Sequence, residues 1–235
     1  MEFSRLSAPS LKELFVTQLE HMILSGKLTI GEKLPPERQL AEVMQVSRAV
    51  VNGGISELEK KGFLITKPRV GTFIADYRRN GTLDTLISIM NYNGGRLRDE
   101  EIRSILEVRI ALETLAVRLL MTRTTPEDIR SLYEKAEKIK TADSITKASE
   151  AAFDFQHELA FLSGNTLLPL IFHSFKVAVL TLWERFCTLY GIDALYNNST
   201  TLITLIHEGN PDSAIQWINE SVDKSIHGSR PIYYS

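Results

Sequence analysis

The sequence has 235 residues, of which 43% are hydrophobic and 24% are charged, with a formal net charge of −2 at pH 7. This length allows one large domain or two small ones, and this composition excludes a disordered or fibrous chain. The apolar runs fall short of the roughly 18 residues that a membrane span needs, and the first residues lack the apolar core of a signal peptide. The single cysteine, Cys187, excludes an internal disulfide and a cysteine-cluster metal site, so we expect a cytoplasmic protein.

The charge is divided unevenly along the chain. Residues 1–79 hold 12 Lys and Arg against 9 Asp and Glu, whereas residues 80–235 hold 15 against 20. An N-terminal part with a positive balance indicates an anionic partner there. A difference of this size is common between two domains, so the indication needs support from motifs.

The first 77 residues predict three helices followed by a β-hairpin. Apolar residues at helical spacing predict helices over 10–25, 36–44 and 48–62, with Ser10 and Ser47 as N-caps. The hairpin is predicted from two short runs, FLITK and TFIAD, on either side of a Pro/Gly turn. This order is typical of a winged helix-turn-helix domain. In such a domain, the second helix of the helix-turn-helix unit lies in the DNA major groove.

After this domain the sequence predicts helices throughout. We expect a linker over 78–98 that contains a short helix, and an antiparallel helical bundle over 99–235. The bundle helices are expected over 99–123, 124–141, 144–163, 166–190, 193–208 and 211–227. The strongly apolar stretch 166–190 is expected at the bundle's centre. The predicted fold is therefore mostly α, a winged helix-turn-helix joined to a helical bundle.

Two stretches resemble a known family: GKLTIGEKLPPERQLAEVMQVSRAVV (26–51) and LEKKGFLITKPRVGTFI (58–74). They are similar to the DNA-binding domain of the GntR transcription regulators. The helical remainder resembles the effector-binding domain of that family's FadR branch. This second resemblance is carried by LEVRIALE (106–113), HELAFLSGN (157–165) and IHEGNPDSA (206–214).

The resemblance implies a bacterial transcription regulator that binds a palindromic double-stranded DNA operator as a homodimer. The effector in its helical domain would either release or promote DNA binding, so repressor and activator both stay open. No enzymatic activity and no membrane association are expected. The implied DNA contacts lie on the second helix, the third helix and the wing: Arg38, Ser47, Arg48, Val50, Asn52, Lys67, Arg69 and Gly71.

The chemistry of these residues agrees with the resemblance. A guanidinium can bind a guanine edge with two hydrogen bonds, and a serine hydroxyl or a helix N-terminus can bind a phosphate. The alternative is that Arg38 and Arg48 are ordinary surface arginines and that the basic hairpin tip is a solvated turn.

The third helix departs from the family pattern in two places. The family usually carries Arg where this chain has Asn52, and Asn prefers adenine and has no charge. Gly53 and Gly54 follow, and each mid-helix glycine costs about 1 kcal/mol relative to alanine. We expect an altered operator. A third helix that is loose until DNA binds, or simple drift, are the alternatives.

The helical domain departs from the metal-binding members of the FadR branch, which hold a divalent metal with one Asp and three His. His157 fits the first histidine, but the aspartate position is Phe153, and Asp154 lies one place off. The other two histidine positions align near Ser199 and Ser221, which are poor ligands for such a metal. We therefore expect no metal cofactor, with Asp154 and His157 as the one ligand pair left open.

The missing ligand set points to an acyl-CoA or a small organic acid as the effector. The candidate effector-binding residues are Arg109, Phe153, His157, Phe161, Phe172 and Trp183. Arg109 would bind an anionic group, or alternatively pair with Glu113 one turn later. The apolar side chains could equally be plain core, and His157 a satisfied core histidine. A metal-dependent carboxylate sensor and an effector-insensitive DNA binder are the rival functions.

Overall fold

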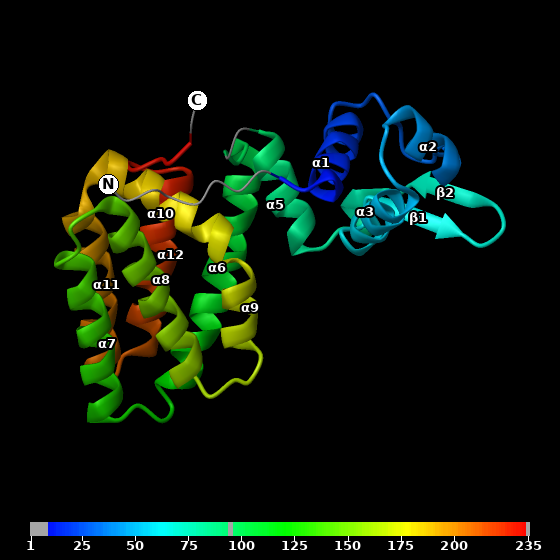
Figure 1. The fold of residues 1–235 in the computed structure, drawn as a ribbon. Coiled ribbons are helices and arrows are strands. Elements are labelled where there is room, and N and C mark those ends of the chain that lie inside the picture. The colour runs from blue at the N-terminus through cyan, green and yellow to red at the C-terminus, as the bar shows by residue number, and fades with distance from the viewer. Residues whose placement is uncertain (1–8, 94–95, 234–235) are drawn as a thin grey trace, which may run out of the picture. The chain divides into compact units, whose positions relative to one another are not determined.

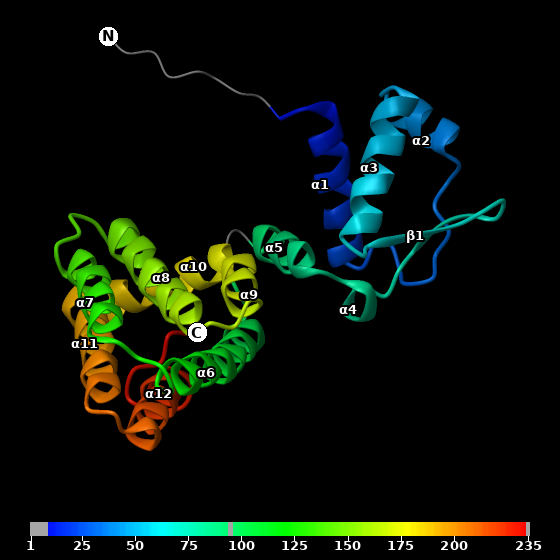
Figure 2. The ribbon, with the colours of Figure 1, turned by 90° about the horizontal axis from the view of Figure 1, so that it is seen from below.

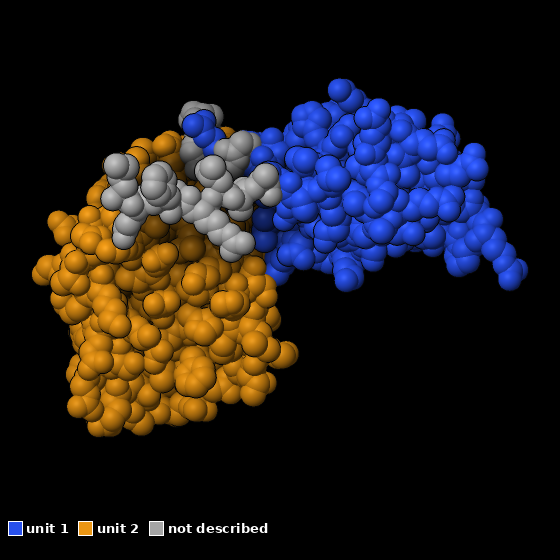
Figure 3. Space-filling model, in the orientation of Figure 1, with its two compact units in different colours: residues 1–96 blue, residues 97–235 orange. Residues whose placement is uncertain are grey.

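A computed structural model describes residues 9–93 and 96–233, and its contacts divide the chain into two compact units, residues 1–96 and 97–235 (Figure 3). The described residues form twelve helices and one two-stranded sheet. The predicted mostly α fold is confirmed. The boundaries 1–77, 78–98 and 99–235 stay a prediction. Most of the predicted linker packs with the first unit.

The first unit is a winged helix-turn-helix (Figure 1). Its elements up to the hairpin are α1 (Leu11–Leu24), α2 (Glu37–Val43), α3 (Arg48–Lys60), β1 (Leu64–Lys67) and β2 (Gly71–Ile74). Ser10 and Ser47 cap α1 and α3, as predicted. The strands are antiparallel, with Leu64 opposite Ile74.

A third segment pairs with the hairpin, which the sequence pattern did not indicate. The Leu34 backbone N–H donates to the Thr72 carbonyl at 2.9 Å, and the Ile74 N–H donates to the Glu32 carbonyl at 2.9 Å. Residues 32–34 therefore run along the free edge of β2. This pairing satisfies backbone groups that an open edge would leave to water.

One apolar core joins the three helices and the hairpin. Its buried side chains are Phe15, Val16, Leu19, Ile23, Leu34, Leu40, Val51, Ile55, Leu58, Phe63, Leu64 and Ile74. Gly54 lies where α3 crosses α1: a Cβ there would come within 2.3 Å of a ring carbon of Phe15. The helix continues regularly through Gly53 and Gly54 to Lys60. Gly54 is therefore required by the close packing of α3 against Phe15.

The stretch predicted as a polar boundary contains a short helix, α4 (Tyr77–Asn80), followed by α5 (Leu83–Tyr92). Asp76 caps α4 by accepting hydrogen bonds from the backbone and side chain of Arg78. The Arg78 side chain holds the pKa of the Asp76 carboxyl below its ordinary value. A capping Asp at the start of a helix is the local signal for α4.

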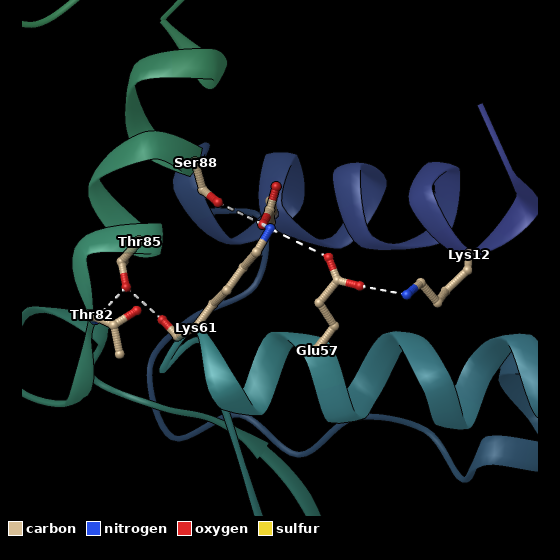
Figure 4. A network of polar contacts seen from close by, with 7 residues as sticks. Lys12, Glu57, Lys61, Thr82, Thr85 and Ser88 are labelled. Carbon is tan, nitrogen blue, oxygen red and sulfur yellow. Dashed lines mark hydrogen bonds and ion pairs between the residues drawn. The ribbon is translucent and has the colours of Figure 1, made fainter. Parts of the chain in front are cut away.

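Polar contacts fasten α5 to α1 and α3 (Figure 4). The Thr85 hydroxyl donates to the Lys61 carbonyl at 2.5 Å, and the Ser88 hydroxyl donates to Glu20 Oε1 at 2.8 Å. Lys61 Nζ lies 2.9 Å from the same Glu20 oxygen. Glu57 pairs with both Lys61 and Lys12, and the hydrogen bond from Lys12 is the main reason that its pKa lies below the ordinary glutamate value.

The second unit is a bundle of seven helices within the described residues. They are α6 (Asp99–Leu120), α7 (Pro126–Lys140), α8 (Ile145–Leu162), α9 (Leu168–Ser174), α10 (Lys176–Tyr190), α11 (Ile192–His207) and α12 (Pro211–Ile226). Thr125 and Asp128 form a capping box at the start of α7, and Asn210 caps α12. Figures 1 and 2 show α7 and α11 side by side.

The centre of the bundle is α8, which packs against α6, α7, α9, α10 and α11. The stretch 166–190, which was expected at the bundle's centre, forms two helices, α9 and α10, of which α10 packs against α8 and α11. That stretch is broken at Phe175, whose N–H donates to the Phe172 carbonyl at 3.2 Å and so closes α9 with a tight turn. The stretch 166–190 carries more apolar residues than the buried face of a helix can accommodate, and Leu167, Leu170 and Val177 are exposed.

No helix of the described residues is long and apolar enough to span a bilayer.

Candidate nucleic-acid interface and ligand cavity

The turn between α2 and α3 sets the exposed start of α3. Gln45 takes a positive φ of 52°, and the Val46 N–H donates to the Ala41 carbonyl at 3.0 Å, which reverses the chain within three residues. The Ser47 hydroxyl then accepts from the Val50 N–H at 3.3 Å. Ser47 is thus first of all the N-cap of α3.

Arg48 and Asn52 lie one turn apart on α3 and are both exposed, whereas Val51 and Ile55 of the same helix are buried in the core. The exposed face is the one that a helix-turn-helix turns toward base edges. The predicted contact Val50 is placed differently, because its side chain is half-buried against the apolar core. The DNA contact expected of Val50 stays a prediction.

Arg38 is exposed on the first turn of α2. Its Nε lies 3.3 Å from Glu42 Oε1, and both side chains are largely in solvent. An exposed pair of this kind is worth little, so Arg38 can exchange Glu42 for a phosphate.

The hairpin forms a basic wing. Lys67 Nζ lies 5.1 Å from the centre of the Phe73 ring, and Lys33 Nζ lies 6.0 Å from it. Gly71 has a φ of 136°, and a Cβ there would come within 2.6 Å of the Lys33 side chain. Sequence reasoning missed Lys33, since only the pairing of residues 32–34 with β2 brings it to the wing.

Arg69 stands at the tip of the wing with a φ of 64°. A left-handed backbone at a residue with a side chain carries a conformational cost that glycine avoids. The protein therefore places a guanidinium here at the expense of stability.

We expect Arg69→Gly to leave the first unit as stable as before, or more stable by up to about 1 kcal/mol. DNA binding should weaken similarly for all sequences, because a phosphate contact is lost. Titration of binding against salt should show the slope reduced by about 1. An unchanged slope would argue against a wing contact.

The second unit encloses a cavity of about 50 Å³. Its walls come from α6, α8, α10, α11 and α12, and Ile232 closes one side. The polar side chains in the wall are Arg109, Glu113, Gln156, Trp183, Asn198, Ser199, Trp217, Ser221 and Ser225. This volume holds roughly three or four water molecules.

Two buried polar atoms of the cavity wall have no hydrogen-bond partner among the described residues. They are Gln156 Oε1 and Trp183 Nε1, and these side chains are only 5% and 3% exposed. Leaving an acceptor and a donor unpaired in a protein interior costs about 1–3 kcal/mol each. A ligand that offers a donor to Gln156 and an acceptor to Trp183 would remove this cost.

Arg109 and Glu113 form the charged part of the wall. Arg109 Nε donates to Glu113 Oε1, and the guanidinium carbon lies 5.1 Å from the centre of the Trp183 ring. The internal salt bridge, left open by the sequence, is therefore present. It engages Nε of Arg109, and both side chains line the cavity.

The predicted effector-binding residues do not all reach this cavity. Arg109 and Trp183 line it, and Phe172 lines a smaller apolar void of about 20 Å³ beside it. Phe161 is 66% exposed, which removes it from any internal wall. Phe153 is buried and stacks on His157, and neither lines the cavity.

On α8, the two positions that hold metal ligands in the FadR branch lie one residue earlier than the sequence comparison placed them. Gln156 faces the cavity, with Ala152 one turn before it, whereas Asp154 is exposed. Ser199 and Ser221 do reach the same wall, as their alignment implied. The described residues contain no group of three or more His, Cys, Asp and Glu arranged to hold a metal ion. The side chains present in the wall do not fit the metal set of the FadR branch.

A wider hollow of about 250 Å³ adjoins the cavity. It shares the wall residues Phe186, Asn198, Trp217 and Ser221 with the cavity and adds Lys224 and Arg230. These two cationic side chains favour an anionic ligand at this end, whereas the charge of Arg109 is already paired with Glu113.

Two protein families match the chain. Residues 12–74 match "Bacterial regulatory proteins, gntR family", and residues 104–224 match "FCD domain". The HTH-type transcriptional regulator Mce2R of Mycobacterium tuberculosis is 27% identical over 76% of this chain and 74% of its own length. The fatty acid metabolism regulator protein of Shewanella pealeana is 28% identical over 66% of this chain and 63% of its own.

A solved structure shares the fold. It is the structure of Lar, which controls the expression of the Listeria monocytogenes agr system and mediates virulence. It aligns with a TM-score of 0.64 and 16% identity, over 95% of this chain and 98% of that one.

Proposed function

The chain belongs to the gntR family of bacterial regulatory proteins and carries an FCD domain, and from this premise we propose a ligand-responsive transcription regulator without catalytic activity. It binds a palindromic operator through α3 and the wing. The observation that carries this proposal is the exposed face of α3, where Arg48 and Asn52 stand at the start of a recognition helix. Such a protein works beside the chromosome, in the cytoplasm.

We propose that the regulator is a homodimer. A palindromic operator presents two half-sites related by a two-fold axis, and two copies of the chain match that symmetry. The exposed apolar side chains at the start of α9 and α10, among them Leu167, Leu170 and Val177, offer surface for such an association. Light scattering of the purified chain measures its mass, and a monomer bound to a full operator would contradict the proposal.

The effector that fits the cavity best is a compact organic acid. A space of about 50 Å³ beside a hollow of about 250 Å³ accepts a small acid, whereas a long acyl chain would need a continuous apolar tunnel. Lys224 and Arg230 favour an anion at one end, and Gln156 and Trp183 favour a hydrogen-bonding group at the other. The acyl-CoA alternative has less support, since Phe161 lies outside the wall.

A thermal-shift screen of small carboxylates and acyl-CoAs tests this assignment. We expect a compact carboxylate to raise the melting temperature, because a ligand that binds only the folded state stabilises it by mass action. Gln156→Leu should reduce the shift. His157→Ala is the matched control on the same helix and should keep it, since His157 does not line the cavity. EDTA should change nothing.

The other outcomes separate the rival functions. A shift with acyl-CoA alone would favour the fatty-acyl sensor, and a shift abolished by EDTA would favour a metal-dependent carboxylate sensor. No shift with any compound would favour an effector-insensitive DNA binder. Elemental analysis that finds about one zinc or nickel per chain would also contradict the metal-free assignment.

A further inference from the structure

The side chain of Asn52 is held between two acceptors. With its amide oriented by these neighbours, the nitrogen donates to Glu37 Oε2 at 2.7 Å and to the Arg48 carbonyl at 3.2 Å. Glu37 belongs to the first turn of α2, so this contact joins the two helices of the helix-turn-helix. Asn52 itself is exposed on the outer face of α3.

These two bonds use the whole donor capacity of the amide. A primary amide nitrogen carries two hydrogens, and here one goes to Glu37 and the other to the Arg48 carbonyl. The amide oxygen remains, together with the carboxylate of Glu37. The pair therefore presents only acceptors to a partner that approaches this face.

An acceptor in the major groove can pair only with an exocyclic amino group. Cytosine presents N4 there, and adenine presents N6 beside the acceptor N7. The usual two-bond recognition of adenine by asparagine needs a donor for N7, and in Asn52 that donor is already engaged. Adenine would keep its acceptor N7 unpaired beside the acceptors of the protein, whereas cytosine itself presents only the N4 donor.

We propose that Glu37 and Asn52 act together as a specificity determinant that selects cytosine at one position of each operator half-site. Asn52 supplies the oxygen that touches the base, and Glu37 is a positioning residue that holds the amide nitrogen away from it. This inference rests on the proposed function, because it requires α3 to lie in the major groove. It also replaces the simple expectation that Asn52 prefers adenine.

The preference can be measured by selecting operators from a random DNA library with the full-length protein, followed by sequencing. We expect cytosine at one position of each half-site, favoured roughly tenfold over the next base. In Glu37→Ala the amide nitrogen is released, and the preference at that position should change to adenine. In Asn52→Ala the preference there should disappear.

Glu42→Ala is the matched control. Glu42 is an exposed glutamate on the same helix, paired with Arg38, and its loss should leave the cytosine preference unchanged. Thermal melting of each variant checks that the first unit is folded, and an unfolded Glu37→Ala is replaced by Glu37→Ser.

Two kinds of failure are distinguishable. If the wild type selects a clear operator, but with adenine or guanine at this position, or with a preference that Glu37→Ala does not alter, the inference is overturned and the proposed function stands. If the wild type selects no sequence at all, the proposed function fails and the inference fails with it.

Discussion

Replacing Gly54 with alanine is expected to destabilise the first unit by about 1–3 kcal/mol, because the new Cβ meets the Phe15 ring in a packed core. The ideal Cβ position lies 2.3 Å from one ring carbon and 2.7 Å from another, so either α3 or the ring must move. Chemical denaturation of the full chain, followed by hydrogen exchange of the α1 and α3 amides, measures the loss.

The adjacent glycine provides the control. A Cβ at Gly53 would lie 3.3 Å from a methylene of Lys12, a flexible side chain that is partly in solvent. Gly53→Ala should therefore be neutral or stabilising, by up to about 1 kcal/mol from helix propensity. If both substitutions change the free energy of unfolding equally, close packing against Phe15 is not the reason for glycine at position 54.

Arg48→Ala should weaken binding to the selected operator by about 1–3 kcal/mol, which is roughly 5- to 150-fold, and should relax the preference at one base pair. Arg48 is exposed at the first residue of α3, where side chains of a recognition helix meet base edges. Gel-shift titration against the operator and against variants of each base pair measures both effects.

Arg103→Ala, which removes an exposed arginine from α6 in the second unit, is the charge-matched control and should leave operator affinity unchanged. An Arg48→Ala variant that loses affinity equally for random DNA and for the operator would assign Arg48 to phosphate contact alone.

Much of the fold could be predicted because its local signals agree with its packing. Ser10, Ser47, Thr125 and Asn210 each start a helix by accepting a backbone N–H, as their residue types suggest. The division of 166–190 could not be predicted, since a continuous apolar run does not show where a helix must turn to stay against its neighbours. The pairing of residues 32–34 with β2 was missed for a similar reason, as it depends on contacts distant in sequence.

The candidate interface was easier to predict than the cavity. Arg38, Arg48, Lys67 and Arg69 are exposed where the resemblance implied. On α8, the periodicity of the sequence identified residues that share a face, but the prediction was one position off. It placed His157 in the cavity wall, whereas Gln156 lines that wall. The signal was in the sequence: the polar Gln156 shares a helix face with the apolar Ala152 and Leu159, one turn before and one turn after it, and all three are buried.

Cys187 has a practical value that follows from its burial. It is the only cysteine of the chain, and burial raises the pKa of its thiol to about 11, so the reactive thiolate is scarce at neutral pH. A cysteine introduced on the surface of either unit can therefore be labelled selectively with the native residue left in place. One such label on each unit makes the distance between the α3 face and the FCD bundle directly measurable by spectroscopy, with and without the effector.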